Sequence, residues 1–206
     1  MDNNRSAART QFPFDGMSTL DRMERAVQLV RERLDRSTEA FESNGIDYAL
    51  GGSNATAVWI AAVDQSAERQ ARNVELVLRR DDLANASVAL EATGFVEKET
   101  DKGLRFLDGP NGNARDAVEI TFGGEPVVGK SPHWLAPNPT DTELIDGRRV
   151  LQLASLVEFE LARYRLDDAV DLRDMLDVGI VDASWLANYP PELAARLQHL
   201  LDTPDG

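Results

Sequence analysis

The 206-residue chain contains no cysteine and only two histidines, His133 and His199. The absence of cysteine excludes disulfide bonds and thiolate-ligated metal sites, and it is typical of proteins in a reducing cytoplasm. The two histidines are isolated in the sequence, so we expect surface or packing roles for them and no zinc site. These absences predict a cytoplasmic protein.

Long apolar runs and an excess of basic charge are also missing. No segment is apolar enough to span a bilayer, and the polar start MDNNRSAARTQ does not resemble a signal peptide. Lysine and arginine total 22 against 36 aspartates and glutamates, which gives a formal net charge of −14. Such a surface repels nucleic-acid phosphates, so neither a membrane partner nor non-specific nucleic-acid binding is expected.

The hydrophobic pattern predicts an α+β chain in three parts. Residues 1–17 are polar and predict a flexible N-terminal arm. Residues 18–148, where helix and strand signals alternate, predict the main domain, with an irregular, proline-containing crossing over 123–147. Helical periodicity from about Val150 predicts a C-terminal helical segment over 149–206. Helices are expected over 18–44, 53–62, 81–94, 153–164, 167–176 and 192–201, and strands over 46–50, 73–78, 95–99, 104–107 and 117–122.

Gly51, Gly52 and Ser53 lie between a predicted strand and a predicted helix. Glycines at such a turn allow close backbone approach, and the N-terminus of the following helix offers free N–H groups to a phosphate. The alternative is that the turn needs glycine for backbone reasons only.

Acidic and amide side chains lie on two of the predicted strands. Asn73 and Glu75 are two residues apart and lie on one face of the first strand, and Glu119 lies on the second. Acidic side chains from two strands at the mouth of a Gly-Gly-Ser turn are typical of a metal–phosphate site. A solvent-exposed polar face is the alternative for each strand.

Together these features resemble the nucleotidyltransferase superfamily, and within it the group that includes the AbiEii-type toxins of bacterial toxin–antitoxin pairs. In that group a Gly-Gly turn precedes an Arg-x-Thr-x-Asp-hydrophobic-Asp strand, and a third carboxylate follows on a later strand. The corresponding segments here are 51–53, ERQARNVELVL at 68–78 and VEIT at 118–121. The family's helical run Arg-x-x-Asp-x-x-Asp-Leu is matched by RLDDAVDL at 165–172.

The resemblance implies a nucleotidyltransferase-like α+β fold, with a mixed sheet, flanking helices and a C-terminal helical segment. In the family, carboxylates hold divalent ions, which bind a nucleoside triphosphate and activate an acceptor hydroxyl. Carried over to this sequence, the nucleotide-binding residues are Gly51, Gly52, Ser53 and Arg69, and the catalytic and Mg²⁺-binding residues are Asn73, Glu75 and Glu119.

Four positions differ from the family pattern. Asn73 replaces the first aspartate and brings no negative charge, on which hard cations depend. Glu75 carries its charge on an arm about 1.5 Å longer, and displacements of about 1 Å already affect in-line chemistry. Ala71 replaces a threonine, and Glu160 falls where a helical lysine is expected, which would reverse the charge that faces the nucleotide. Together these differences favour loss of nucleotidyl transfer.

Three hypotheses remain open at this point. The first is a Mg²⁺-dependent nucleotidyltransferase that uses a nucleoside triphosphate. This hypothesis includes a transferase of the toxin type. The second is a catalytically inactive relative, a pseudoenzyme that acts as a binding module or through a protein partner. The third is an unrelated protein whose strands mimic the motif, which predicts that the strands of Glu75 and Glu119 are not neighbours. For the acids of the 167–177 helix we expect mostly solvated side chains, with Arg163, Arg165 and Arg173 as ion-pair partners.

Overall fold

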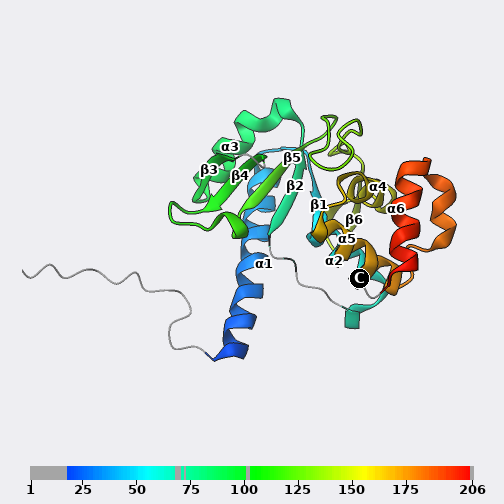
Figure 1. Cartoon of the computed structure of the whole chain (residues 1–206). Coiled ribbons are helices and arrows are strands. Elements are labelled where there is room, and N and C mark those ends of the chain that lie inside the picture. Colours follow the sequence, from blue (N-terminus) through cyan, green and yellow to red (C-terminus); the bar gives the residue numbers. More distant parts are fainter. Residues whose placement is uncertain (1–17, 68–70, 72, 101–102, 205–206) are drawn as a thin grey trace, which may run out of the picture.

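The computed structural model of the chain describes residues 18–67, 71, 73–100 and 103–204 (Figure 1). The N-terminal arm predicted over residues 1–17 lies outside the described residues. The helices are α1 (Thr19–Ser43), α2 (Gly52–Val63), α3 (Leu83–Ala92), α4 (Leu153–Arg163), α5 (Leu166–Asp177) and α6 (Pro191–Asp202), with short 3₁₀ turns at Gln65–Ala67, Arg80–Asp82, Ala114–Asp116 and Ala183–Asn188. The strands are β1 (Tyr48–Gly51), β2 (Val74–Leu78), β3 (Phe95–Thr100), β4 (Gly103–Asp108), β5 (Val118–Phe122), β6 (Thr142–Ile145) and β7 (Arg148–Leu151).

The strands form one mixed sheet in the order β3-β4-β5-β2-β1-β7-β6. β2 runs parallel to β5 and β1 runs parallel to β7, whereas the other neighbours are antiparallel. The predicted α+β class, with a mixed sheet and C-terminal helices, is therefore confirmed. β2 lies inside the sheet and all five of its residues are buried, as is typical of a strand covered on both faces. A charged side chain on β2 is consequently shielded from solvent.

The expectation of an irregular crossing over residues 123–147 is wrong at its C-terminal end. Residues Thr142–Ile145 and Arg148–Leu151 form an antiparallel hairpin, and β7 joins the sheet beside β1. Asp146 and Gly147 form the turn with φ values of 48° and 78°, as expected for an Asp-Gly hairpin. β7 spans the boundary placed after residue 148, so the helical segment follows directly on a strand of the main sheet.

The helices pack in two groups around the sheet (Figure 1). α1 contacts α3, β2 and β5, and it begins at the predicted cap: the hydroxyl of Ser18 accepts the Asp21 N–H, and the Ser18 N–H donates to the Asp21 carboxylate. α2, α4, α5 and α6 contact one another and form the second group. Within the described residues, no helix combines the length and apolarity needed to cross a membrane.

Candidate functional site

A cavity of about 560 Å³ lies where β2, β5 and the start of α2 meet. Five of the seven site residues that the sequence predicted line it: Gly52, Ser53, Asn73, Glu75 and Glu119. Gly51 is buried at the end of β1, and Arg69 lies outside the described residues. Ala71, the position of the missing threonine, lines a separate and smaller cavity.

Gly52 opens α2 in a backbone conformation that favours glycine. Its φ is +54°, and a Cβ built on it would lie 2.6 Å from Oε2 of Glu75. Gly51 has a φ of −123° and leaves room for a Cβ at ordinary contact distances. The second glycine is therefore needed both for the turn and for the close approach of the Glu75 carboxylate.

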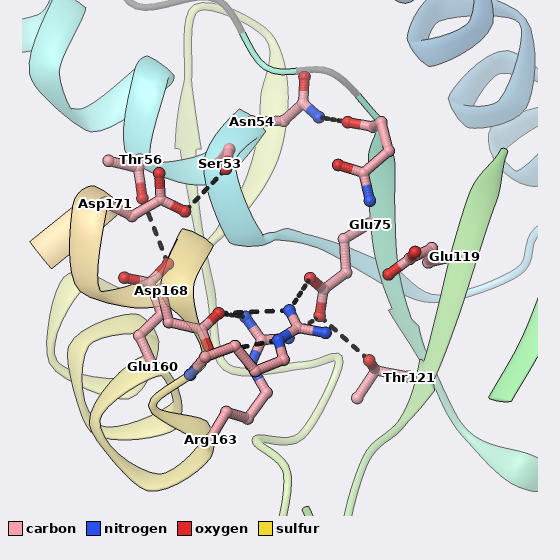
Figure 2. Close-up of polar contacts among 12 residues, drawn as sticks. Ser53, Asn54, Thr56, Glu75, Glu119, Thr121, Glu160, Arg163, Asp168 and Asp171 are labelled. Atoms are coloured by element: carbon pink, nitrogen blue, oxygen red, sulfur yellow. Dashed lines mark hydrogen bonds and ion pairs between the residues drawn. The ribbon is translucent and has the colours of Figure 1, made fainter. Parts of the chain in front are cut away.

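Ser53 already has an anionic partner from within the chain. Its Oγ donates a 2.7 Å hydrogen bond to Oδ2 of Asp171 on α5 (Figure 2). Asp171 is buried, and its carboxylate lies beside the first turn of α2, where the helix dipole stabilises negative charge. A phosphate bound by Ser53 would have to share this position with Asp171.

Asn73 directly precedes β2, which begins one residue later than the sequence predicted. The Asn73 carbonyl accepts a hydrogen bond from the side-chain amide of Asn54 on α2, which ties the start of β2 to that helix. Asn73 lines the cavity but carries no charge. The first predicted ligand position therefore offers at most a neutral amide oxygen.

Glu75 lies at the centre of a buried ion-pair network (Figure 2). Its Oε1 accepts hydrogen bonds from Nη1 of Arg163 and, at 3.1 Å, from the hydroxyl of Thr121. Nη2 of Arg165 lies 3.6 Å from Oε2. Both arginines also bind Asp168 on α5, at 2.7 Å from Arg163 and 3.2 Å from Arg165. Glu75 is only 4% exposed, so the alternative of a solvated polar face is wrong for β2.

Glu119 lies directly beside Glu75, because the register of the parallel pair β2–β5 aligns the two residues. This contradicts the hypothesis that the two strands only mimic the motif. Nη2 of Arg105 on β4 lies 2.5 Å from Oε1 of Glu119. Burial, followed by the neighbouring charge of Glu75, raises the pKa of Glu119, and Arg105 opposes that rise.

Glu160 does not face the nucleotide position, contrary to the expectation from the sequence. It is fully buried on α4 and is not part of the cavity wall. Its Oε1 accepts a 3.3 Å hydrogen bond from Thr56 on α2, and Oε2 has no hydrogen-bond partner among the residues that the structure describes. Burial and the negative charges of Asp171 and Asp168 raise the pKa of Glu160 well above its ordinary value. The surroundings of Glu160 therefore favour its protonated form.

The described residues do not fit a divalent ion at Glu75. In the described ranges, no three or more histidine, cysteine, aspartate and glutamate side chains are grouped to hold a metal. The sequence-predicted set consists of one neutral amide and two carboxylates, and an arginine is bonded to each carboxylate. The Arg163 and Arg165 guanidinium groups would repel an incoming cation, whereas Mg²⁺ needs several oxygen ligands in near-octahedral geometry.

The bond between Arg163 and Glu75 is the part of the site that the sequence did not indicate. Arg163 and Arg165 were expected to pair with acids of the following helix, and their bonds to Asp168 confirm this. Arg173 instead donates to the Thr203 carbonyl. The additional bond from Arg163 to Glu75 joins residues 88 positions apart. The only sequence signal near it is the family-like run that begins at Arg165.

Among known proteins, this chain is similar to several solved structures. Neither the protein-family models nor the curated proteins include a match. The antibiotic-resistance factor ANT(2'')-Ia shares 14% identity over 87% of this chain and 84% of its own, with a TM-score of 0.43. JHP933 from Helicobacter pylori shares 14% identity over 90% and 76%, with a TM-score of 0.45. An antigenic nucleotidyltransferase-like protein from Paracoccidioides brasiliensis shares 15% identity over 87% and 88%, with a TM-score of 0.44. Because these scores are low, we base the function on the residues of the site.

Proposed function

We propose that this chain is a non-catalytic nucleotidyltransferase-like protein that acts as a binding or interaction module. The bond between Glu75 and Arg163 carries the proposal. The resemblance in sequence assigns Glu75 to the centre of a two-metal site, and here an arginine from α4 neutralises it. The side chains of Glu75 and Arg163 are 6% and 4% exposed, so the pair does not exchange freely with solvent ions.

Nucleotidyl transfer places specific demands on such a site. Two divalent ions about 3.5–4 Å apart stabilise the attacking and leaving oxygens, and carboxylates hold them. At this site Glu75 bonds Arg163, Glu119 bonds Arg105, and Asn73 is neutral. Breaking a buried ion pair leaves an uncompensated charge, at a cost of about 3–5 kcal/mol. Metal binding would have to overcome this cost before any chemistry could begin.

A Mg²⁺-dependent nucleotidyltransferase is the second candidate, and one observation favours it. The residues carried over from the family line one cavity of about 560 Å³, within the roughly 300–1,000 Å³ typical of small-molecule sites. This candidate requires Arg163 to leave Glu75, so that Asn73, Glu75 and Glu119 become available to Mg²⁺ and Gly52 and Ser53 to the triphosphate.

Thermal melting of the full chain with each nucleoside triphosphate, with and without Mg²⁺ or Mn²⁺, separates the two candidates. A ligand present at about 100 times its dissociation constant adds about 2.7 kcal/mol of stability. The non-catalytic proposal predicts no metal-dependent shift in melting temperature. A shift that needs both nucleotide and metal would favour the transferase and justify a search for its acceptor.

Asn73→Asp is the matched variant for this experiment, because it restores the charge that the family pattern places there. A gain of Mg²⁺ affinity in Asn73→Asp, with none in the unmodified chain, would support a site that lost its metal through substitution. An equal response in both chains would contradict that explanation.

A further inference from the structure

We infer that Arg163 is an internal replacement for a divalent cation: its guanidinium group holds Glu75 and Asp168 together, and its removal exposes a site that a divalent ion can enter. The inference rests on the proposed function in one respect, that no divalent ion neutralises Glu75 in the unmodified chain. It goes further because it assigns the neutralising charge to one side chain and predicts a metal response when that side chain is lost.

The guanidinium of Arg163 bridges carboxylates from two separate elements (Figure 2). Its Nη1 bonds Glu75 of β2, and its Nη2 bonds Asp168 of α5 at 2.7 Å. The exposed fractions of these three side chains are 6% or less. Two buried carboxylates that face one position repel each other unless a cation lies between them. Arg163 supplies that cation.

Arg163 is held in place along its length. It is the last residue of α4, and its guanidinium carbon lies 4.0 Å from the centre of the Phe159 ring. Its carbonyl accepts the Lys130 N–H at 3.0 Å. A Cβ on Gly129 would come within 2.5 Å of the Arg163 backbone, so glycine is needed for the loop to pack there. The guanidinium is therefore pre-positioned between the carboxylates.

Arg165 spans the same two carboxylates more weakly than Arg163. Its side chain is 44% exposed, and its guanidinium lies 3.6 Å from Glu75, an ion pair beyond ordinary hydrogen-bond distance. Asp168 reaches Arg165 at 3.2 Å, so Arg165 contacts the same acids from a more exposed position. Without Arg163, the described part of the chain would keep the buried carboxylates of Glu75 and Asp168 with one guanidinium beside them, the half-exposed group of Arg165. That arrangement attracts a small, doubly charged cation.

The test is thermal melting of the full chain carrying Arg163→Met, which preserves side-chain length and removes the charge. Loss of one partner of a buried pair should lower the melting temperature by roughly 6–20 °C for a chain of this size. Mg²⁺, Mn²⁺ or Ca²⁺, at about 100 times its dissociation constant, should then restore roughly 5–10 °C. Ionic strength is held constant with NaCl, so that screening does not contribute.

Two further variants test whether the response to divalent ions is specific to the loss of Arg163. Arg196→Met removes a half-buried arginine of α6 that bonds Glu192 and the carbonyls of Leu161 and Ala162, so it should destabilise the chain without creating an ion response. The double variant Arg163→Met with Glu75→Gln removes one carboxylate of the exposed site, and it should also melt independently of divalent ions.

The outcomes are distinct. An Arg163→Met chain that melts cooperatively and does not respond to divalent ions overturns the inference, and so does an equal response in Arg196→Met. If Arg163→Met does not fold, Arg163→Lys replaces it in the experiment. Because an ammonium group reaches one carboxylate at a time, we expect a smaller loss of melting temperature and a smaller gain with divalent ions. No gain in Arg163→Lys would contradict the inference. An ion response in the unmodified chain would instead overturn the proposed function.

Discussion

Glu75 and Glu160 are two glutamates of similar burial whose surroundings differ. Glu75, on β2, contacts two guanidinium groups and a threonine hydroxyl. Glu160, on α4, accepts a hydrogen bond from Thr56, and its neighbours include the acids Asp168 and Asp171. Glu75 borders the cavity, whereas Glu160 lies outside its wall.

The difference shows that this protein handles buried acidic charge in two ways. Around Glu75 the charge is retained and matched by arginines, because an unpaired buried charge is strongly unfavourable. Around Glu160, burial and neighbouring carboxylates raise the pKa and so disfavour the charged form. The two regions therefore respond in opposite directions to the same chemical change, from glutamate to glutamine.

Glu75→Gln should cause the largest effect, because it removes one anion from the arginine network. We expect a loss of about 3–5 kcal/mol in the free energy of unfolding, the range for a buried pair that loses one partner. Urea unfolding measures it, with an unchanged m-value showing that the denatured state is unaffected. The exposed Glu143→Gln on β6 is the control and should stay within about 0.5 kcal/mol. A loss below about 1 kcal/mol for Glu75→Gln would mean that the pair contributes little.

Gly52→Ala disturbs the same network from the side of α2. The new Cβ would lie 2.6 Å from Oε2 of Glu75, on a residue whose φ is +54°. We expect a loss of about 1–3 kcal/mol from backbone strain and displacement of the carboxylate. Gly51→Ala, whose Cβ meets neighbours at 3.6 Å or more, should lose less than about 1 kcal/mol. Equal losses in urea unfolding would show that the contact with Glu75 is unimportant.

The elements that surround the cavity could be predicted from the sequence because their signals are local. The Gly51–Gly52 turn, the alternation around Glu119 and the capping residue Ser18 are each encoded within a few residues. The hairpin of β6 and β7 also has a local signal, the Asp146–Gly147 pair, but this pair directly follows a proline-containing stretch that is typical of irregular structure.

The partners of the two glutamates could not be predicted in the same way. The bond between Arg163 and Glu75 joins residues 88 positions apart and depends on how α4 packs against the sheet. The position of Glu160 does not follow from the sequence because α4 is buried around most of its circumference, as Leu156, Val157 and Leu161 show. Helical periodicity identifies one apolar face, and it gives no orientation for a helix that is buried on several sides.

Glu160→Gln should give the smallest change, and one of opposite sign at neutral to alkaline pH. The charged groups around Glu160 are Asp171 and Asp168 of α5, Glu75 of β2 and Arg163 of α4. Because the folded-state pKa of Glu160 lies above its ordinary value of 4.5, protonated Glu160 favours folding. This contribution is fully present below 4.5 and is lost as the pH rises through the folded-state pKa.

Glutamine cannot ionise, so the Glu160→Gln chain should lose less stability than the unmodified chain as the pH is raised from about 5 to about 9. Urea unfolding at each pH measures the two slopes. Because the pKa of Glu160 is raised, the difference in stability between the two chains should be smallest at the low end of this range and should grow with pH. Parallel pH profiles would show that Glu160 does not change its charge in this range. A steeper loss in the glutamine variant would mean that the carboxylate of Glu160 is ionised and stabilising.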